Sequence, residues 1–305
     1  MKSRFWSSAI AVTASMTILG AGPAKATENG IASYPVGVST VLNGILPAPG
    51  ETRFYNYMQY YSANKFAGPN GQSIIPGFKS SVFVEAPRII HTWNQTLGPF
   101  SLSSGIIVPL FNTDLTLPVG SGSKTAVGDI IIHPLMIGYT NSSHSLFVMS
   151  SFDVALPTGA YDPKRIANTG LNTYAFMPNI SATWFPTQDW ELSGTAQLEF
   201  NSRNHATDYQ SGTVATLEGL VGYSVRKDLQ LGVQGFYLKQ ISDDKQNGQA
   251  VAGNGFRGQA MGIGPQIRWD WTPGSAVTFK YQREFSVRNR PQGDRFWLQV
   301  SVPFK

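Results

Sequence analysis

Charged side chains in the second half of the chain recur at even spacing within segments that otherwise carry few charges. Arg268 and Asp270 are two residues apart, and Lys280 and Glu284 are four apart. In an extended strand such residues point to the same face. These charged side chains could line a cavity that selects ions or steers a polar head group. Alternatively, they could form ion pairs between adjacent strands that brace the interior. We predict a lumen lined by Glu199, Glu218, Gln266, Arg268, Asp270, Lys280, Gln282, Glu284 and Arg295.

Candidates for covalent or metal chemistry are weak. The four histidines lie on separate segments and lack the spacing of a zinc-binding HExxH motif; they are His91, His133, His144 and His205. Ser202 and His205 could form the nucleophile and base of a barrel lipase, but a serine-rich loop produces such neighbours by coincidence. The loop at 157–162 offers one carboxylate, Asp162, too few ligands for calcium. We therefore predict no catalytic residue, no metal site and no cofactor.

Composition indicates a β-protein. The chain has 305 residues, of which 42% are hydrophobic, 12% aromatic and 13% charged, and its Cys count of 0 excludes a disulfide scaffold and a lipid-anchored lipoprotein. The charged fraction is about half that of ordinary soluble domains. A mean hydropathy of -0.12 excludes a polytopic helical membrane protein. Ample apolar surface also excludes a disordered chain.

The first 26 residues have the features of a secretory signal peptide. Lys2 and Arg4 precede an uncharged stretch at 5–19, and an Ala-Lys-Ala sequence ends at Ala26. We predict cleavage after Ala26. The segment contains three basic residues and no acidic ones, so its removal lowers the net charge from +5 to +2. That balance gives no support to a nucleic-acid partner.

Period-two alternation then recurs along the chain. In the clearest segment, Met261, Ile263 and Ile267 share one face, while small and polar residues occupy the other. A further segment places Phe279 and Val287 on its apolar face. The predicted strands are 51–62, 80–93, 99–111, 129–140, 144–156, 172–185, 189–201, 212–225, 229–242, 256–271, 276–288 and 294–304.

Connections between these segments alternate between short and long. The longer ones are 63–79, 112–128, 157–171, 202–211, 243–255 and 289–293. Short turns at one end and longer loops at the other are typical of outer-membrane barrels. We predict an all-β fold: a transmembrane antiparallel up-and-down β-barrel of about 12 strands spanning 51–305, in the outer membrane of a Gram-negative bacterium. A soluble β-sandwich with Met261, Phe279 and Val300 between two layers is the alternative.

Residues 27–50 precede the first strand and are rich in apolar residues, glycine and proline. One interpretation is an N-terminal arm that folds back into the lumen as a plug; the other is a periplasmic extension or a loose terminus. The predicted plug residues are Tyr34, Pro35, Val38, Leu42 and Leu46. A twelve-stranded barrel is intermediate in width between side-chain-filled and open barrels, which is compatible with partial plugging.

Apolar residues are also expected at the outer rim. They could form a capture groove for a hydrophobic solute, or they could pack together as a lid. The capture residues that we predict are Phe66, Ile74, Ile75, Phe78 and Phe111. Five prolines fall inside predicted strands and must lie at bulges or beyond the bilayer; they are Pro87, Pro109, Pro134, Pro178 and Pro265.

Several motifs resemble a family of bacterial outer-membrane proteins associated with the meta-cleavage pathway of phenol degradation. They include Gly128-Asp129-Ile130, Leu156-Pro157-Thr158-Gly159, Glu199-Phe200-Asn201 and Tyr209-Gln210-Ser211-Gly212. The resemblance implies a barrel that passes hydrophobic or aromatic compounds. It also implies membrane lipid, lipopolysaccharide and the barrel-assembly machinery as partners. That machinery reads a terminal aromatic residue, whereas Phe304 is followed here by Lys305.

The functional expectation is a monomeric channel for diffusion of small hydrophobic or aromatic solutes. An envelope-structural or adhesion barrel without transport is one alternative, and a barrel lipid hydrolase is a weaker one.

Overall fold

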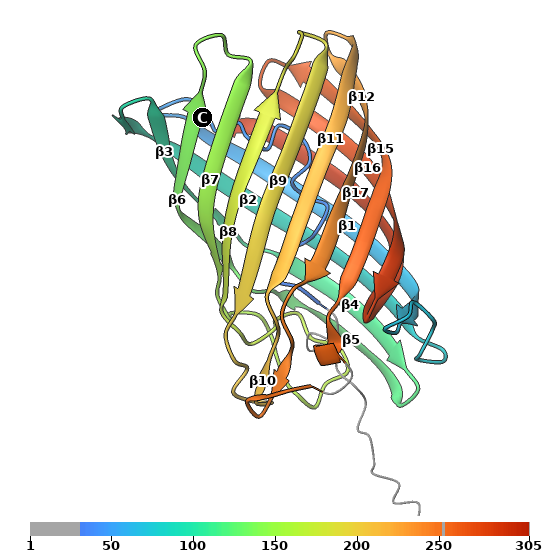
Figure 1. Cartoon of the computed structure of the whole chain (residues 1–305). Coiled ribbons are helices and arrows are strands. Elements are labelled where there is room, and N and C mark those ends of the chain that lie inside the picture. Colours follow the sequence, from blue (N-terminus) through green and yellow to red (C-terminus); the bar gives the residue numbers. More distant parts are fainter. Residues whose placement is uncertain (1–30, 252–253, 305) are drawn as a thin grey trace, which may run out of the picture.

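A closed β-barrel forms the body of the protein in the computed structural model, which describes residues 31–251 and 254–304 (Figure 1). Twelve antiparallel strands make up its wall, as the alternation predicts. The first strand pairs with both the second and the last, and this closes the barrel. The predicted signal peptide, its cleavage site after Ala26 and residues 27–30 of the arm lie outside the described residues.

Two of the wall strands are each built from two segments. The strand segments are β1 (Thr52–Ala67), β2 (Lys79–Leu97), β3 (Phe100–Ile107), β4 (Leu110–Leu117), β5 (Gly120–Val127), β6 (Ile131–Thr140), β7 (Leu146–Ala155), β8 (Ala175–Trp184), β9 (Trp190–Asn201), β11 (Val214–Arg226), β12 (Leu229–Gln240), β15 (Gln259–Thr272), β16 (Ser275–Arg288) and β17 (Arg290–Phe304). β4 continues β3 along β2, and β5 leads into β6. No helix in the described parts of the chain is long and apolar enough to cross a membrane.

The two ends of the barrel differ. At one end, which we call the turn end, strands are joined by 98–99, 141–145, 185–189, 227–228 and 273–274. At the other, the loop end, longer connections cover 68–78, 156–174, 202–213 and 241–258. The last two contain β10 (Tyr209–Gln210), β13 (Lys245–Gln246), β14 (Gln249–Ala250) and the short 3-10 helix η1 (Asn254–Phe256). This asymmetry agrees with the predicted alternation of short and long connections.

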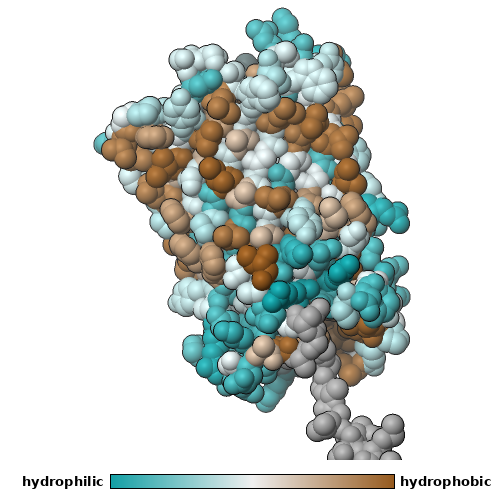
Figure 2. All heavy atoms as spheres, viewed as in Figure 1, coloured by the Kyte–Doolittle hydropathy of each residue, from teal (hydrophilic) through white to brown (hydrophobic). Residues whose placement is uncertain are grey.

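Apolar side chains face outward and polar ones inward. Ile263 and Phe279 are 52% and 55% exposed, whereas Gln266 and Lys280 are buried. Figure 2 shows apolar residues across the barrel wall and hydrophilic ones gathered near the loop end. The sandwich alternative fails because it requires Phe279 to be sequestered between two layers.

One predicted face is wrong. Val287 is 2% exposed and packs inside the barrel with Val36 and Ala67, although the alternation places it on the outward face of Phe279. An extra residue in β16 opposite β15 causes this, and Ser286 adopts a positive φ of 52°. The resulting β-bulge reverses the direction of every later side chain in the strand.

The predicted long loop at 112–128 is also wrong. These residues belong to a hairpin of β4 and β5 joined at 118–119. β5 consists mainly of Gly, Ser, Thr and Ala, so it lacks the apolar alternation that marks the other strands. Phe66, which falls in the predicted loop 63–79, lies in strand β1, and Phe111, at the end of the predicted strand 99–111, lies in β4. In place of the predicted loop 289–293, only Asn289 separates β16 from β17.

The in-strand prolines coincide with interruptions of the sheet. Pro109 lies between β3 and β4, and β2 changes partner from β4 to β3 around Pro87. Pairing skips Pro134 on both sides of β6, Pro178 between β8 and β9, and Pro265 between β15 and β16. A residue without an N–H group is tolerated where the ladder already lacks a hydrogen bond.

Candidate functional site

The arm, residues 31–50, lies inside the barrel and extends from the loop end to the turn end. It is visible as the blue chain within the barrel in Figure 1. Three glutamates on β9 and β11 accept hydrogen bonds from its backbone amides. Glu199 binds Ser33 N and Tyr34 N at 3.0 and 3.2 Å, Glu218 binds Gly37 N and Ser39 N at 2.5 and 2.7 Å, and Glu191 binds Leu42 N at 2.7 Å.

A lysine on β16, which is separated from β11 by β15 and β12, holds the same part of the arm. Lys280 Nζ donates to Gly37 O at 2.8 Å and to Val38 O at 2.9 Å, and it also reaches Thr40 Oγ1. Gly37 adopts a φ of +92°, and a Cβ there would collide with Gln282, so this turn requires glycine. Amides bound by Glu218 and carbonyls bound by Lys280 together fix the arm in one register.

Apolar packing adds to these polar contacts. Leu46 packs against a cluster of Ile90, Met136 and Met149, and Tyr34 contacts two further clusters. The most buried apolar residue of the arm is Val36, which is 2% exposed and is not among the predicted plug residues. Its neighbours are Ala67, Val214, Phe236, Leu238, Ala260 and Val287.

The nine predicted lumen residues all lie on β9, β11 and β15–β17. Seven are buried, while Arg268 and Asp270 are partly buried. Most are engaged with one another or with the arm. Arg295 pairs with Glu284 at 2.6 Å, and Arg268 pairs with Asp270 at 2.5 Å. This favours the bracing interpretation for these pairs over a free field of ions.

Open space lies on the other side of the arm. A cavity of about 570 Å³ is enclosed mainly by the arm, β1, β2, β4, β6–β8 and β17. Of the nine predicted lumen residues, only Arg268 and Arg295 border it. Its apolar lining includes Leu46, Ile90, Ile107, Ile131, Met136, Met149 and Met177.

The predicted capture residues gather at one end of this cavity. Phe66 and Phe78 pack edge to face with ring centroids 5.6 Å apart, and Ile75 packs against them. These three and Phe111 border the cavity, whereas Ile74 is 42% exposed. Leu115 and Leu117 join the same cluster, so the rim residues form a packed group rather than isolated exposed side chains.

Several polar residues of the cavity wall are not among the predicted lumen residues. Arg88 on β2 and Asp153 on β7 border the cavity. His133 on β6 forms a hydrogen bond with Asp153, with its Nδ1 2.6 Å from Asp153 Oδ1. Alternation within the predicted strands 80–93, 129–140 and 144–156 is the signal that could have placed them inside. That signal was weak because these strands contain prolines at 87 and 134.

Two of the quoted motifs meet at the β5–β6 junction. Asp129 accepts hydrogen bonds from Gly159 N at 2.9 Å and Leu171 N at 2.7 Å. Ile130 N donates to Thr158 Oγ1 at 2.9 Å. The connection 156–174 is thereby attached beside β5, whose only strand partner among the described residues is β4. Asp129 therefore closes the wall at a position where the sheet itself is interrupted.

Replacing Asp129 by alanine should free this connection. The loss of two charge-assisted hydrogen bonds should lower its local stability by about 3 kcal/mol. We expect trypsin to cleave folded D129A after the exposed Lys164 or Arg165 much faster than the wild type. D114N, at an exposed position on β4, is the matched control. Equal cleavage rates for D129A and the wild type would contradict this role.

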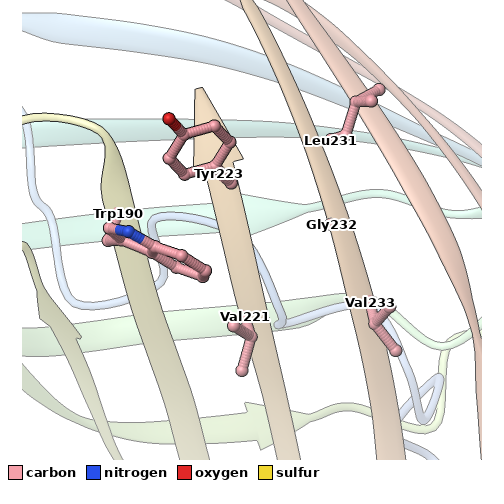
Figure 3. A pocket seen from close by; sticks show the side chains of 6 residues that line it. All are labelled: Trp190, Val221, Tyr223, Leu231, Gly232 and Val233. Carbon is pink, nitrogen blue, oxygen red and sulfur yellow. The ribbon is translucent and has the colours of Figure 1, made fainter. Parts of the chain in front are cut away.

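The outer face carries a shallow pocket near the turn end (Figure 3). Its volume is about 360 Å³, and its lining residues are Trp190, Val221, Tyr223, Leu231, Gly232 and Val233. The rings of Trp190 and Tyr223 are 5.0 Å apart. Aromatic residues of this kind sit at the interface between bilayer and water in membrane barrels, and the exposed side chains of Trp190 and Tyr223 place the pocket on the outer face of the wall, away from the lumen.

The possible hydrolase pair is not assembled. Ser202 Oγ accepts a hydrogen bond from Tyr174 N at 2.9 Å, and the described contacts of Ser202 do not include His205, which is exposed. No group of three or more potential metal-binding side chains occurs within 31–251 and 254–304.

The family model described as "Putative MetA-pathway of phenol degradation" matches residues 63–300. The chain belongs to this family. The match confirms the resemblance carried by the motifs. No match to a curated protein was found.

Two solved structures show what this family member is similar to. An outer membrane channel from Pseudomonas putida F1 superposes with a TM-score of 0.75 and 17% identity, covering 88% of this chain and 98% of the channel. The β domain of a Bordetella autotransporter gives a TM-score of 0.52 and 11% identity, covering 83% and 100%. The family member thus has the fold of outer-membrane barrels.

Proposed function

We propose that the protein is a monomeric outer-membrane channel through which small hydrophobic or aromatic solutes diffuse. The observation that carries this proposal is the cavity beside the arm. Its wall combines apolar clusters from five or more strands with tyrosine and phenylalanine rings. A site of this kind removes apolar solute surface from water, while its polar side chains, which include Arg88 and Asp153, stand between the apolar clusters.

The charges of the lumen support the same proposal. Ion pairs such as Arg295–Glu284 are satisfied within the protein, and Glu218 and Lys280 are occupied by the arm. Few of these charges remain to attract mobile ions. The arm would act as the plug, and its displacement would widen the path along β9–β17.

Entry at the loop end follows from the rim cluster. Phe66, Ile75 and Phe78 border the cavity and form its apolar mouth. A solute leaving water there would contact rings first and then Ile107 and Ile131 deeper in the wall. Outward-facing apolar residues would contact membrane lipid and lipopolysaccharide, and the exposed Phe304 at the end of β17 would be read by the assembly machinery.

Liposome flux tests the proposal. Purified protein in vesicles should pass benzyl alcohol roughly tenfold faster than a sugar of similar size, which corresponds to about 1.4 kcal/mol in barrier height. Protein-free vesicles measure the background permeation of each solute, which is subtracted. Equal protein-dependent rates for the two solutes would reject apolar selectivity, and no protein-dependent flux of either would favour a structural or adhesion barrel.

A further inference from the structure

Three arginines that border the cavity have no carboxylate within ion-pair distance in the described parts of the chain. They are Arg53, Arg88 and Arg290. Arg53 Nη1 donates to Gly274 O at the turn end. Arg290, at the loop end, interacts electrostatically with Glu284 and Glu199. Arg88 differs from both because it lies away from the two ends and from the acidic residues that hold the arm.

The guanidinium of Arg88 is only partly satisfied. Its Nη1 donates to Tyr57 Oη at 3.3 Å, and its Cζ lies 5.8 Å from the ring centroid of Tyr55. Its Nε is buried and has no hydrogen-bond partner among residues 31–251 and 254–304. Arg88 is partly buried, and a guanidinium removed from water normally forms several charge-assisted hydrogen bonds. The unpaired Nε–H indicates that an acceptor is missing.

The acidic group that interacts with Arg88 is not this acceptor. Asp153 interacts with Arg88 electrostatically but forms no ion pair with it. Its Oδ1 is bound by His133 and Ser151, and its Oδ2 by Asn179 at 3.1 Å. Both carboxylate oxygens of Asp153 therefore already accept hydrogen bonds from other residues, and none of these bonds comes from Arg88.

Apolar surface adjoins Arg88 on both sides. In the sheet register Arg88 is level with Tyr55 on β1 and Ile107 on β3, and Ile107 is level with Ile131 on β6. All four border the cavity. Tyr55 and Tyr57 lie with their rings parallel, at an interplanar angle of 3°. A small planar solute could rest on these rings while its charged group faced the guanidinium.

We propose that Arg88 and Tyr57 form a binding site for the carboxylate of an apolar acid, such as an aromatic or short-chain acid, whose body lies against Tyr55, Ile107 and Ile131. This inference rests on the proposed channel function and names a substrate class for it. A guanidinium suits a carboxylate because its planar donors match both oxygens. The site would retain an anionic solute beside the apolar clusters of the cavity.

The test compares benzoate with its neutral counterpart benzamide. Binding to the full mature chain in a non-ionic detergent is measured by equilibrium dialysis at pH 7.5. The wild type should bind benzoate more tightly than benzamide. R88M should weaken benzoate binding about tenfold to 100-fold, the effect of losing a charge-assisted contact, and leave benzamide binding unchanged. R88K should recover part of the loss, and R257M, which changes an exposed arginine outside the cavity, should match the wild type.

Each outcome decides between the two proposals. Heat-dependent migration in gels establishes that each variant is folded, and the wild-type preference for benzoate is measured independently of any variant. Unchanged benzoate binding in folded R88M, or no wild-type preference, would overturn the carboxylate site. Benzamide flux above sugar flux would in that case leave the channel proposal standing. Loss of selective flux for both aromatic solutes would instead reject the channel.

Discussion

Deletion of residues 31–48 is expected to convert a nearly closed barrel into a conducting pore. The arm occupies the lumen along β9–β17, where its backbone is bound by Glu191, Glu199, Glu218 and Lys280. A twelve-stranded barrel without its arm is wider than the barrels that side chains fill completely. We expect single-channel conductance to rise by roughly an order of magnitude.

A peptide of residues 27–50 provides the control for this deletion. Added to the deleted barrel, it should restore the block, because the polar partners of the arm remain on the wall. A peptide in which Gly37 is replaced by valine should fail, since a side chain there collides with Gln282. If the deleted barrel folds but conducts no more than the wild type, the lumen is closed by its own side chains and a structural role is favoured.

The strands that sequence analysis predicted best are those with large outward side chains. β15, β16 and β17 alternate residues such as Ile263 and Phe296 with inward polar ones, so period two is plain. β5 has only small and polar residues on both faces, and the same reasoning assigned it to a loop. Alternation also cannot predict a bulge, which is why Val287 was placed on the wrong face.

The arrangement of the lumen depended on contacts that sequence spacing does not encode. Lys280 and Gly37 are 243 residues apart in the chain, and Glu218 and Gly37 are 181 apart. Even spacing predicted that Lys280 and Glu218 point inward, but their partners are backbone groups of the arm. Arg88 was missed because its strand contains a proline and carries its polar residues less regularly.

Replacing Lys280 by methionine should release the arm from the wall. The variant removes the donors to Gly37 O, Val38 O and Thr40 Oγ1 and leaves the buried Glu218 without its basic neighbour. Lys280 and Glu218 interact electrostatically without forming an ion pair, so the cost of leaving Glu218 without its basic neighbour should lie below the value of about 3–5 kcal/mol for a broken buried ion pair. If the arm is a movable plug as proposed, much of this cost should favour the displaced arm, which is measured as frequent channel opening in single-channel recordings.

A second substitution separates the electrostatic effect of leaving Glu218 without Lys280 from the loss of the hydrogen bonds that Lys280 donates to the arm. E218Q keeps an acceptor oxygen for only one of the amides of Gly37 and Ser39, places an NH2 group at the other, and removes the buried negative charge. The double variant K280M/E218Q should therefore open less often than K280M, because no unpaired charge remains in the lumen. K245M, at an exposed position in β13, should behave as the wild type. If K280M and E218Q both leave gating unchanged, apolar packing around Val36 holds the arm, and the charged pair serves only to brace the wall.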